Sequence, residues 1–113
     1  QPKSLHCERN LSFQTKAGAF FRKEGCAARD LGVLAARLLR KDRGGQLSVL
    51  ELMAGTGMRA ARYLLEADAD FVWANEANQA NHHTVVANLS RAAAEKNGGV
   101  ASQSRPCGNI APE

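Results

Sequence analysis

The sequence predicts an α/β fold, in which a pair of parallel strands has helices packed beside it. Two short apolar runs, residues 47–52 and 71–75, are typical of buried strands. Helical periodicity comes before, between and after them, so the predicted order is helix, strand, helix, strand, helix. This alternation favours adjacent parallel strands joined by a right-handed crossover. With 113 residues, the chain is long enough for one small domain.

The first predicted helix follows a basic N-terminal segment without sustained periodicity. We expect residues 1–28 to form loops or short strand pieces. From Asp30, a natural N-cap residue, apolar side chains recur at helical spacing until Gly44 and Gly45 end the pattern. The expected apolar face consists of Leu31, Leu34, Ala35, Leu38 and Leu39. The sequence therefore predicts an amphipathic helix that begins at residue 30.

The later elements are separated by glycine or by short polar turns. A helix over residues 57–66 follows the first strand, and a long helix over residues 77–96 follows the second. The apolar side of the long helix consists of Val85, Val86, Leu89 and Ala93. Trp73, inside the second strand, is expected in the core. Residues 97–113 are polar and aperiodic, and we expect this tail to be disordered.

Positive charge is concentrated in the N-terminal part of the chain. The net charge is +4 and the sequence pI is about 9.3. Residues 1–43 contain ten basic and four acidic side chains, whereas residues 44–113 contain five and seven. The basic end is therefore the better candidate for contacting RNA or DNA. The alternative is a solvated basic face without a partner.

The pattern of cysteines and histidines predicts no metal site. Cys7, Cys26 and Cys107 are far apart and form no C-x-x-C pair, so neither a zinc site nor a disulfide framework is expected. His82 and His83 are adjacent on a predicted helix and point about 100° apart, which does not suit one shared ion. No apolar run approaches the roughly 20 residues of a membrane span. The chain begins with Gln and not with Met, so we expect that its true start, with any targeting peptide, is missing. The expected localisation is therefore intracellular, with nucleus, mitochondrion and plastid all open.

The turn between the first strand and the second helix is a candidate nucleotide-binding element. Residues 55–60, GTGMRA, fit the pattern G-x-G-x-x-A, in which Gly55 and Gly57 allow a tight turn. Glu76 lies 19 residues after Gly57, just past the second strand. A carboxylate there can accept hydrogen bonds from both hydroxyls of a ribose. The alternative is a tight strand-to-helix turn that binds nothing.

Glu51, at the end of the first strand, helps to discriminate between two ligands. NAD and FAD bring an anionic pyrophosphate to such a turn, and a carboxylate beside it would repel that group. S-adenosylmethionine has no phosphate and carries a sulfonium and an ammonium, which a carboxylate attracts. The charge of Glu51 therefore favours S-adenosylmethionine, although a role at the start of the following helix is compatible with either ligand.

Several motifs around the glycine turn occur together. Glu51, Gly55 and Thr56 precede residues 57–63, GMRAARY, and the aromatic pair Phe20-Phe21 and Arg29-Asp30-Leu31 lie upstream. Together these motifs resemble the first half of the catalytic domain of tRNA (guanine-26, N2) dimethyltransferases, most closely the plant and algal branch. The family shows an acidic residue, then four positions later a small residue, then Ser or Thr, then G-[LIM]-R-x-x-R-[YF], with an aromatic pair and an Arg-Asp-Leu upstream. The resemblance covers roughly residues 12–93.

The chain departs from the family pattern in two respects. Glu stands at positions 51 and 76, where the family more often has Asp, which keeps the charge but lengthens the reach. Arg22 and Lys23 follow the aromatic pair, where the family more often continues with Asn-Pro. The family's Asp-Pro-[FY]-Gly segment, which holds the amine of the target guanine, has no counterpart. We therefore expect a fragment that is inactive alone.

The resemblance implies a partial, incomplete Rossmann-like class I methyltransferase fold. Residues 1–28 would be a basic segment, 29–96 the N-terminal half of the S-adenosylmethionine-binding domain, and 97–113 a tail. The implied reaction transfers methyl from S-adenosylmethionine to guanine N2 in tRNA. The alternatives are a methyltransferase with another substrate, an NAD-dependent oxidoreductase domain and a non-catalytic RNA-binding remnant.

The predicted cofactor-binding residues are Arg29, Glu51, Gly55, Gly57, Arg59 and Glu76, and no catalytic residue is predicted. Arg29 resembles the family arginine that holds the methionine carboxylate of the cofactor. Arg59 lies unfavourably near a helix N-terminus, which suggests a ligand or RNA role or an ion pair with Glu51 or Glu76. Arg62 is expected to be structural. The adjacent aromatic pair, Phe20 and Phe21, would stack on a base or pack in the core.

Overall fold

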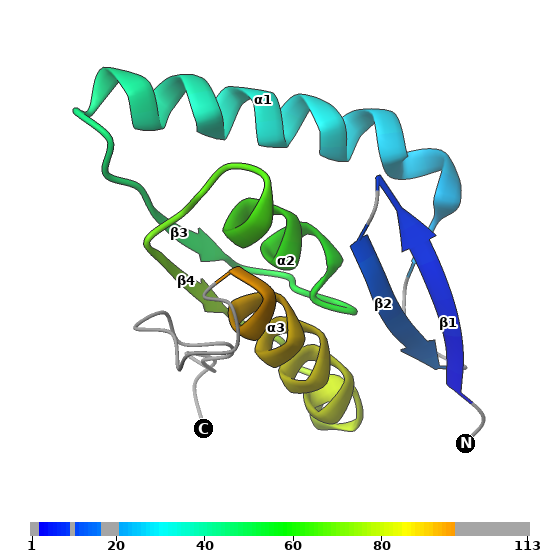
Figure 1. The fold of residues 1–113 in the computed structure, drawn as a ribbon. Coiled ribbons are helices and arrows are strands. Elements are labelled where there is room, and N and C mark those ends of the chain that lie inside the picture. Colours follow the sequence, from blue (N-terminus) through cyan, green and yellow to red (C-terminus); the bar gives the residue numbers. More distant parts are fainter. Residues whose placement is uncertain (1–2, 10, 17–20, 97–113) are drawn as a thin grey trace.

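The computed structural model describes residues 3–9, 11–16 and 21–96. Its main unit is a parallel pair of strands, β3 (Ser48–Glu51) and β4 (Phe71–Ala74), with Ser48 opposite Phe71 and Glu51 opposite Ala74. Helices α2 (Met58–Leu65) and α3 (His82–Lys96) pack beside them, and α1 (Cys26–Asp42) lies along α2 (Figure 1). The predicted parallel pair and the helix order are confirmed.

One face of the strand pair is covered by helices, and this is where the core lies. Val72 and Ala74 are fully buried together with Leu64 of α2 and with Val85 and Leu89 of α3. Leu50 and its register partner Trp73 share the opposite face, where Leu50 is 54% exposed. Trp73 was expected in the core and is instead half-buried, because alternate residues of a strand point to opposite faces.

The N-terminal segment contains a regular hairpin. Strands β1 (Lys3–Glu8) and β2 (Leu11–Lys16) pair antiparallel, and in β2 the side chains alternate between buried and half-buried. Phe13 is fully buried, and β2 packs on α3 (Figure 1). The expected boundary at residue 28 lies inside α1, so the basic segment and the following unit are joined by a helix. Phe20 and the tail over residues 97–113 lie outside the described residues.

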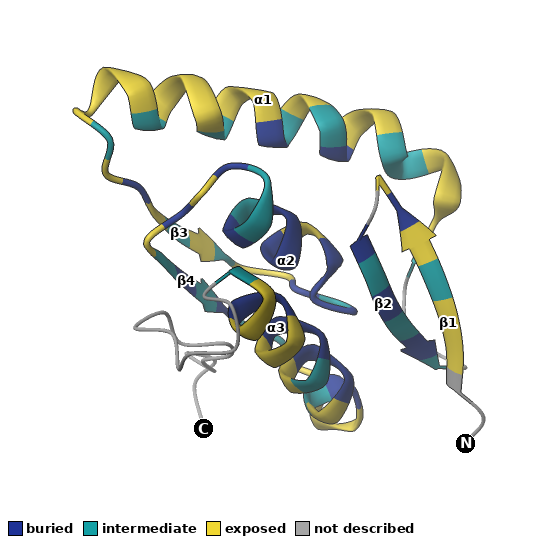
Figure 2. Ribbon diagram, in the orientation of Figure 1, coloured by how far each residue is buried: buried dark blue, intermediate teal, exposed yellow. Residues whose placement is uncertain are grey.

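Helix α1 begins earlier than predicted and turns a different face inward. A 3-10 turn over Lys23–Gly25 leads into the helix at Cys26, and Asp30 is an internal residue instead of the N-cap. Val33 is buried and Ala36 half-buried, whereas four leucines of the predicted apolar face are about half exposed or more (Figure 2). These exposed leucines are Leu31, Leu34, Leu38 and Leu39. The reason lies in the ion pairs of Arg29 and Asp30, which orient the helix.

The C-terminal end of α1 and the start of α3 follow local backbone preferences. Gly44 and Gly45 have positive φ angles of 70° and 89°, which end α1 as predicted. Helix α3 begins at His82 and not at residue 77, because the Asn78 side chain accepts a hydrogen bond from Ala80 N at 3.0 Å and a 3-10 turn follows. On α3, Val86 is 42% exposed, so the predicted apolar side was wrong at that position.

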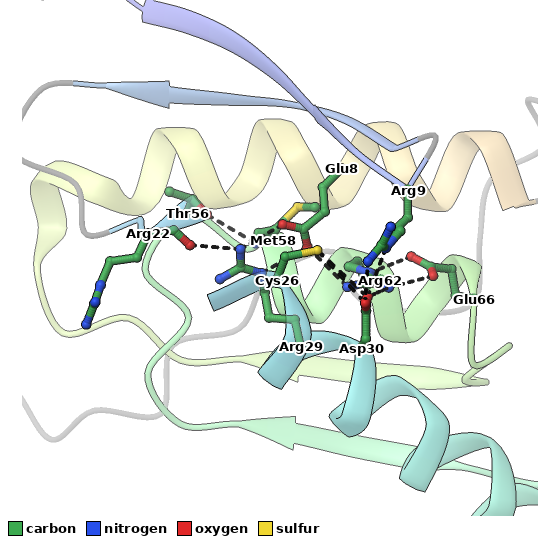
Figure 3. A network of polar contacts seen from close by, with 10 residues as sticks. All are labelled: Glu8, Arg9, Arg22, Cys26, Arg29, Asp30, Thr56, Met58, Arg62 and Glu66. Atoms are coloured by element: carbon green, nitrogen blue, oxygen red, sulfur yellow. Dashed lines mark hydrogen bonds and ion pairs between the residues drawn. The ribbon is translucent and has the colours of Figure 1, made fainter. Parts of the chain in front are cut away.

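A cluster of charged side chains joins the hairpin to α1 and α2 (Figure 3). Glu8 of β1 receives two hydrogen bonds from Arg29, at 2.9 and 2.7 Å, and one from Arg62 at 3.1 Å. Arg62 is 2% exposed and also bonds Asp30 at 2.8 Å and Glu66 at 2.6 Å. With Arg9, which pairs with Asp30 at 2.7 Å, three arginines balance three carboxylates. The expected structural role of Arg62 is confirmed.

The arginines keep the carboxylates of this cluster ionised. Burial opposes ionisation of Glu8, but the hydrogen bond and charge of Arg29 and the charge of Arg62 outweigh it, so the pKa of Glu8 is lowered from 4.5. Hydrogen bonds from Arg9 and Arg62 lower the pKa of Asp30 from 3.8 to about 2. The cluster therefore remains charged at any physiological pH.

Replacing Glu8 by glutamine should strongly destabilise the chain. Glu8→Gln keeps the shape but leaves the buried Arg29 and Arg62 each short of a carboxylate, so we expect a loss of about 3–5 kcal/mol in the free energy of unfolding. Urea denaturation followed by circular dichroism measures it. Glu24→Gln makes the same chemical change at an exposed position and should cost less than about 0.5 kcal/mol. Equal effects of the two variants would contradict a stabilising cluster.

The stability of the chain should fall in acid. Both folded-state pKa values are lowered, so the stabilisation is complete above the unfolded values of 4.5 and 3.8 and is lost as pH falls toward about 2. In Asp30→Asn, the part of this loss that comes from Asp30, between about pH 4 and pH 2, should disappear, while the part that comes from Glu8 remains. Urea midpoints measured between pH 2 and pH 6 test this, and identical pH profiles of the two proteins would refute it.

Candidate functional site

The glycine turn follows β3 at the carboxyl ends of the two parallel strands. Gly55 and Gly57 have positive φ angles of 61° and 84°, a left-handed conformation that other residues rarely adopt. Gly57 is also the N-cap of α2, and a Cβ atom there would lie 3.4 Å from Cα of Val85 in α3. The second glycine therefore allows both the turn and the close approach of α3.

Three amide groups of this turn, those of Gly55, Gly57 and Met58, are already bonded within the protein. Gly57 N donates to Ala54 O at 2.8 Å, and Met58 N donates to the Thr56 hydroxyl at 3.3 Å. Gly55 N donates to Oε1 of Glu76 at 2.9 Å. A phosphate would have to displace these acceptors, because phosphate-binding turns offer free N–H groups.

Glu76 lies just after β4, as predicted, and fastens the loop after β4 to the glycine turn. Besides Gly55 N, its carboxylate accepts hydrogen bonds from Asn78 N at 3.0 Å and from Nδ2 of Asn81 at 3.4 Å. A carboxylate has about four acceptor sites, so little capacity is left for a ribose unless one of these bonds is exchanged. The predicted ribose contact stays a prediction.

A hollow of about 350 Å³ opens beside the glycine turn, and we call it the turn hollow. Its walls are residues 51–55, Met58 and Arg59 of α2, and Phe21, Arg22 and Arg29. Four of the predicted site residues, Arg29, Glu51, Gly55 and Arg59, thus come together. Gly57 and Glu76 do not line it. Gly57 is part of the turn itself, and Glu76 accepts the hydrogen bond from Gly55 N.

The turn hollow is lined by charges of both signs. Glu51 is half-buried, and this burial raises the pKa of its carboxyl above 4.5, although the positive charge of Arg59 opposes the shift. Arg59 is exposed, and no ion pair joins it to Glu51 or Glu76 among the described residues. The Glu51 carboxylate is therefore costly to ionise without a further cation beside it.

Arg29 is held rigidly and has a single unused nitrogen. Its Nε and Nη2 bond Glu8, and Nη2 also donates to Arg22 O at 2.9 Å (Figure 3). Nη1 lies beside Gly25, where an added Cβ would come within 2.7 Å, and it makes no hydrogen bond among the described residues. Glu8 thus fixes the guanidinium of Arg29, a residue that is 8% exposed and lines the turn hollow.

Phe21 forms an aromatic wall of the turn hollow and also packs inward. Its ring meets Phe13 edge-on, with 5.0 Å between the ring centres, and the guanidinium carbon of Arg29 lies 4.9 Å from its centre. Core packing is therefore confirmed for Phe21, and stacking on a base or on the adenine stays a prediction.

Asn88 of α3 is a site residue that we did not predict. It is 2% exposed, and its amide accepts from Gln14 N at 2.7 Å and donates to Gln14 O at 2.8 Å and to Thr56 O at 2.7 Å. It joins β2 to the glycine turn. The signal in the sequence is an amide within the apolar stripe of a helix, between Val85 and Leu89, where a buried polar group needs partners.

The remaining predictions concern the histidines, the metal and the membrane. His82 is half-buried, as expected, and its Nε2 contacts the backbone oxygen of Glu76, while His83 is exposed. Within residues 3–9, 11–16 and 21–96, no three metal-binding side chains come together. In the same residues, no helix has the length and apolar character needed to cross a membrane.

The sequence that forms this site matches a known protein family. Residues 2–103 match the family described as N2,N2-dimethylguanosine tRNA methyltransferase. A search of curated proteins finds no match. The match extends over the hairpin, the turn hollow and both parallel strands, which is most of the chain. The chain therefore belongs to the N2,N2-dimethylguanosine tRNA methyltransferase family.

Proposed function

We propose that the turn hollow binds S-adenosylmethionine and that the enzyme transfers its methyl group to N2 of guanine 26 in tRNA. The observation that carries the proposal is the charge pattern of the hollow. The hollow is lined by Arg22, Arg29, Arg59 and the half-buried Glu51. In the turn beside them, the amides of Gly55, Gly57 and Met58 already have acceptors. A zwitterionic amino-acid group needs cations and an anion together.

Each charged group has a suitable partner on this ligand. The Glu51 carboxylate matches the α-ammonium group, and the Nη1 edge of Arg29 or the Arg59 guanidinium matches the α-carboxylate. Phe21 offers an apolar ring for the adenine. Glu76 is the carboxylate that we propose as the hydrogen-bond acceptor for the ribose hydroxyls. Burial raises the pKa of Glu51, and a ligand ammonium group beside it would favour the ionised carboxylate.

A dinucleotide fits the same hollow less well. The arginines would attract a pyrophosphate, but Gly55 N, Gly57 N and Met58 N already have acceptors, and Glu51 would repel the phosphates. The alternative function is that of an NAD-dependent oxidoreductase domain, and a titration with NADH tests it.

In the proposed reaction, the cofactor supplies an electrophilic methyl group on a sulfonium. The guanine amine forms the new C–N bond as the S–C bond breaks, the thioether leaves with its electron pair, and the amine loses one proton. The residues of this chain bind and orient the cofactor. None of the described residues is assigned as the proton acceptor.

Glu51→Gln should weaken binding of S-adenosylhomocysteine about tenfold, equivalent to about 1.4 kcal/mol. In the wild type, affinity should fall as pH drops through the raised pKa of Glu51, since only the ionised form attracts the ammonium, and the variant should lack this step. Calorimetric titration measures both, with NADH as the competing ligand. Tighter binding of NADH than of S-adenosylhomocysteine would overturn the proposal.

The same variant offers a second readout without ligand. A raised carboxyl pKa contributes stability that is lost as pH rises through it, so the ligand-free Glu51→Gln chain should be more stable than wild type at neutral pH. Urea denaturation at pH 7 measures this. A variant that binds less tightly and is also less stable would indicate general damage.

Glu76→Ala should weaken S-adenosylhomocysteine binding by roughly 1–3 kcal/mol, because the carboxylate holds the glycine turn and is the proposed ribose acceptor. Glu95→Ala removes an exposed carboxylate from α3 and serves as the matched control. Unchanged affinity in calorimetry would remove Glu76 from the site.

A further inference from the structure

We propose that a second hollow, next to the turn hollow, binds the phosphate backbone of the RNA substrate. This hollow has a volume of about 460 Å³ and lies between the hairpin and the start of α1. It is lined by His6, Thr15, Lys16, Phe21, Arg22, Lys23 and Glu24, and we call it the basic hollow. The inference rests on the proposed function, because it needs an RNA whose base reaches the methyl donor.

The two hollows share a wall. Phe21 and Arg22 line both of them. In Figure 3, the side chain of Arg22 points away from the Arg29 guanidinium, while its backbone oxygen accepts a hydrogen bond from Arg29 at 2.9 Å. An RNA bound in the basic hollow would thus be separated from the proposed cofactor by Phe21 and Arg22 only. A methyl acceptor needs to lie this near to the methyl donor.

Two of the three cations of the basic hollow have no partner among the described residues, whereas Nζ of Lys16 also donates to the backbone oxygen of Ala80. Lys16, Arg22 and Lys23 outnumber the single acid, Glu24. Arg22 and Lys23 are exposed, and neither side chain has an ion pair among the described residues. By contrast, the arginines of the charged cluster are neutralised by carboxylates. Unpaired cations beside a substrate site are the electrostatic signature of phosphate binding.

Another basic hollow at the far end of α1 gives a matched comparison. It is lined by Arg37, Arg40 and Lys41 with one acid, Asp68. Its charge is similar, but Arg40 pairs with Asp68 at 3.3 Å, and it shares no residue with the turn hollow. Position relative to the cofactor, and not charge alone, therefore distinguishes the two hollows.

The test compares two double charge reversals in the 113-residue chain, Lys16→Glu with Lys23→Glu and Arg37→Glu with Lys41→Glu. Fluorescence anisotropy measures the affinity for an unmodified tRNA transcript at several salt concentrations. The first double variant should bind at least tenfold more weakly and lose about two from the salt slope, one for each phosphate contact. The second should change affinity less than threefold.

Equal losses in the two double variants would show a dependence on net charge only and would overturn the proposal, as would unchanged binding in the first. Binding of S-adenosylhomocysteine is measured in parallel. A wild-type chain that binds tRNA as expected but not S-adenosylhomocysteine would refute the proposed cofactor while supporting the basic hollow. If the first double variant loses its cooperative thermal transition, its weaker tRNA binding results from misfolding. This outcome would count against the proposal.

Discussion

The pairing of Glu8 with Arg29 and Arg62 is the interaction on which the rest of this structure depends. Glu8 is in the hairpin, Arg29 in α1 and Arg62 in α2, so one carboxylate ties together three elements that are 21 and 54 residues apart. Buried guanidinium groups without carboxylates would be very costly, which makes the arrangement of the three elements strongly interdependent. The pairing also decides which face of α1 points inward, at the expense of four leucines that stay exposed.

The same interaction reaches the turn hollow through Arg29. Two nitrogens of the guanidinium are fixed by Glu8, so Arg29 contributes to the wall of the hollow in one orientation. A ligand carboxylate would then find a donor that has already lost its rotational freedom, which reduces the entropy cost of binding. The glycine turn is held in a comparable way from three sides, by Glu76, by Asn88 and by the contact of Gly57 with Val85. The proposed cofactor site is thus preorganised by residues that mostly lie outside it.

Glu51 differs from the carboxylates of Glu8 and Asp30 in how its charge is compensated. Its carboxylate is half-buried beside the turn and is hard to ionise in the absence of a cation, whereas the carboxylates of Glu8 and Asp30 are easy to ionise. The difference follows from the number of guanidinium hydrogen bonds that each receives. A half-buried acid that receives no guanidinium hydrogen bond is the basis of our proposal that Glu51 meets a cationic group of a ligand.

The sequence by itself determined the parallel strand pair, the helix order, the glycine turn and the acids at both strand ends, because apolar runs and glycine positions act through local backbone preferences and burial. It also identified Arg29, Glu51, Gly55 and Arg59, which lie around one hollow. Only the tertiary structure decided the hairpin, the rotation of α1 and the roles of Glu8 and Asn88. The physical reason is that their partners are far away in sequence. Glu8 is charged and Asn88 is polar, so periodicity assigns both to the surface, and only contacts with Arg29, Arg62, Gln14 and Thr56 make their burial favourable.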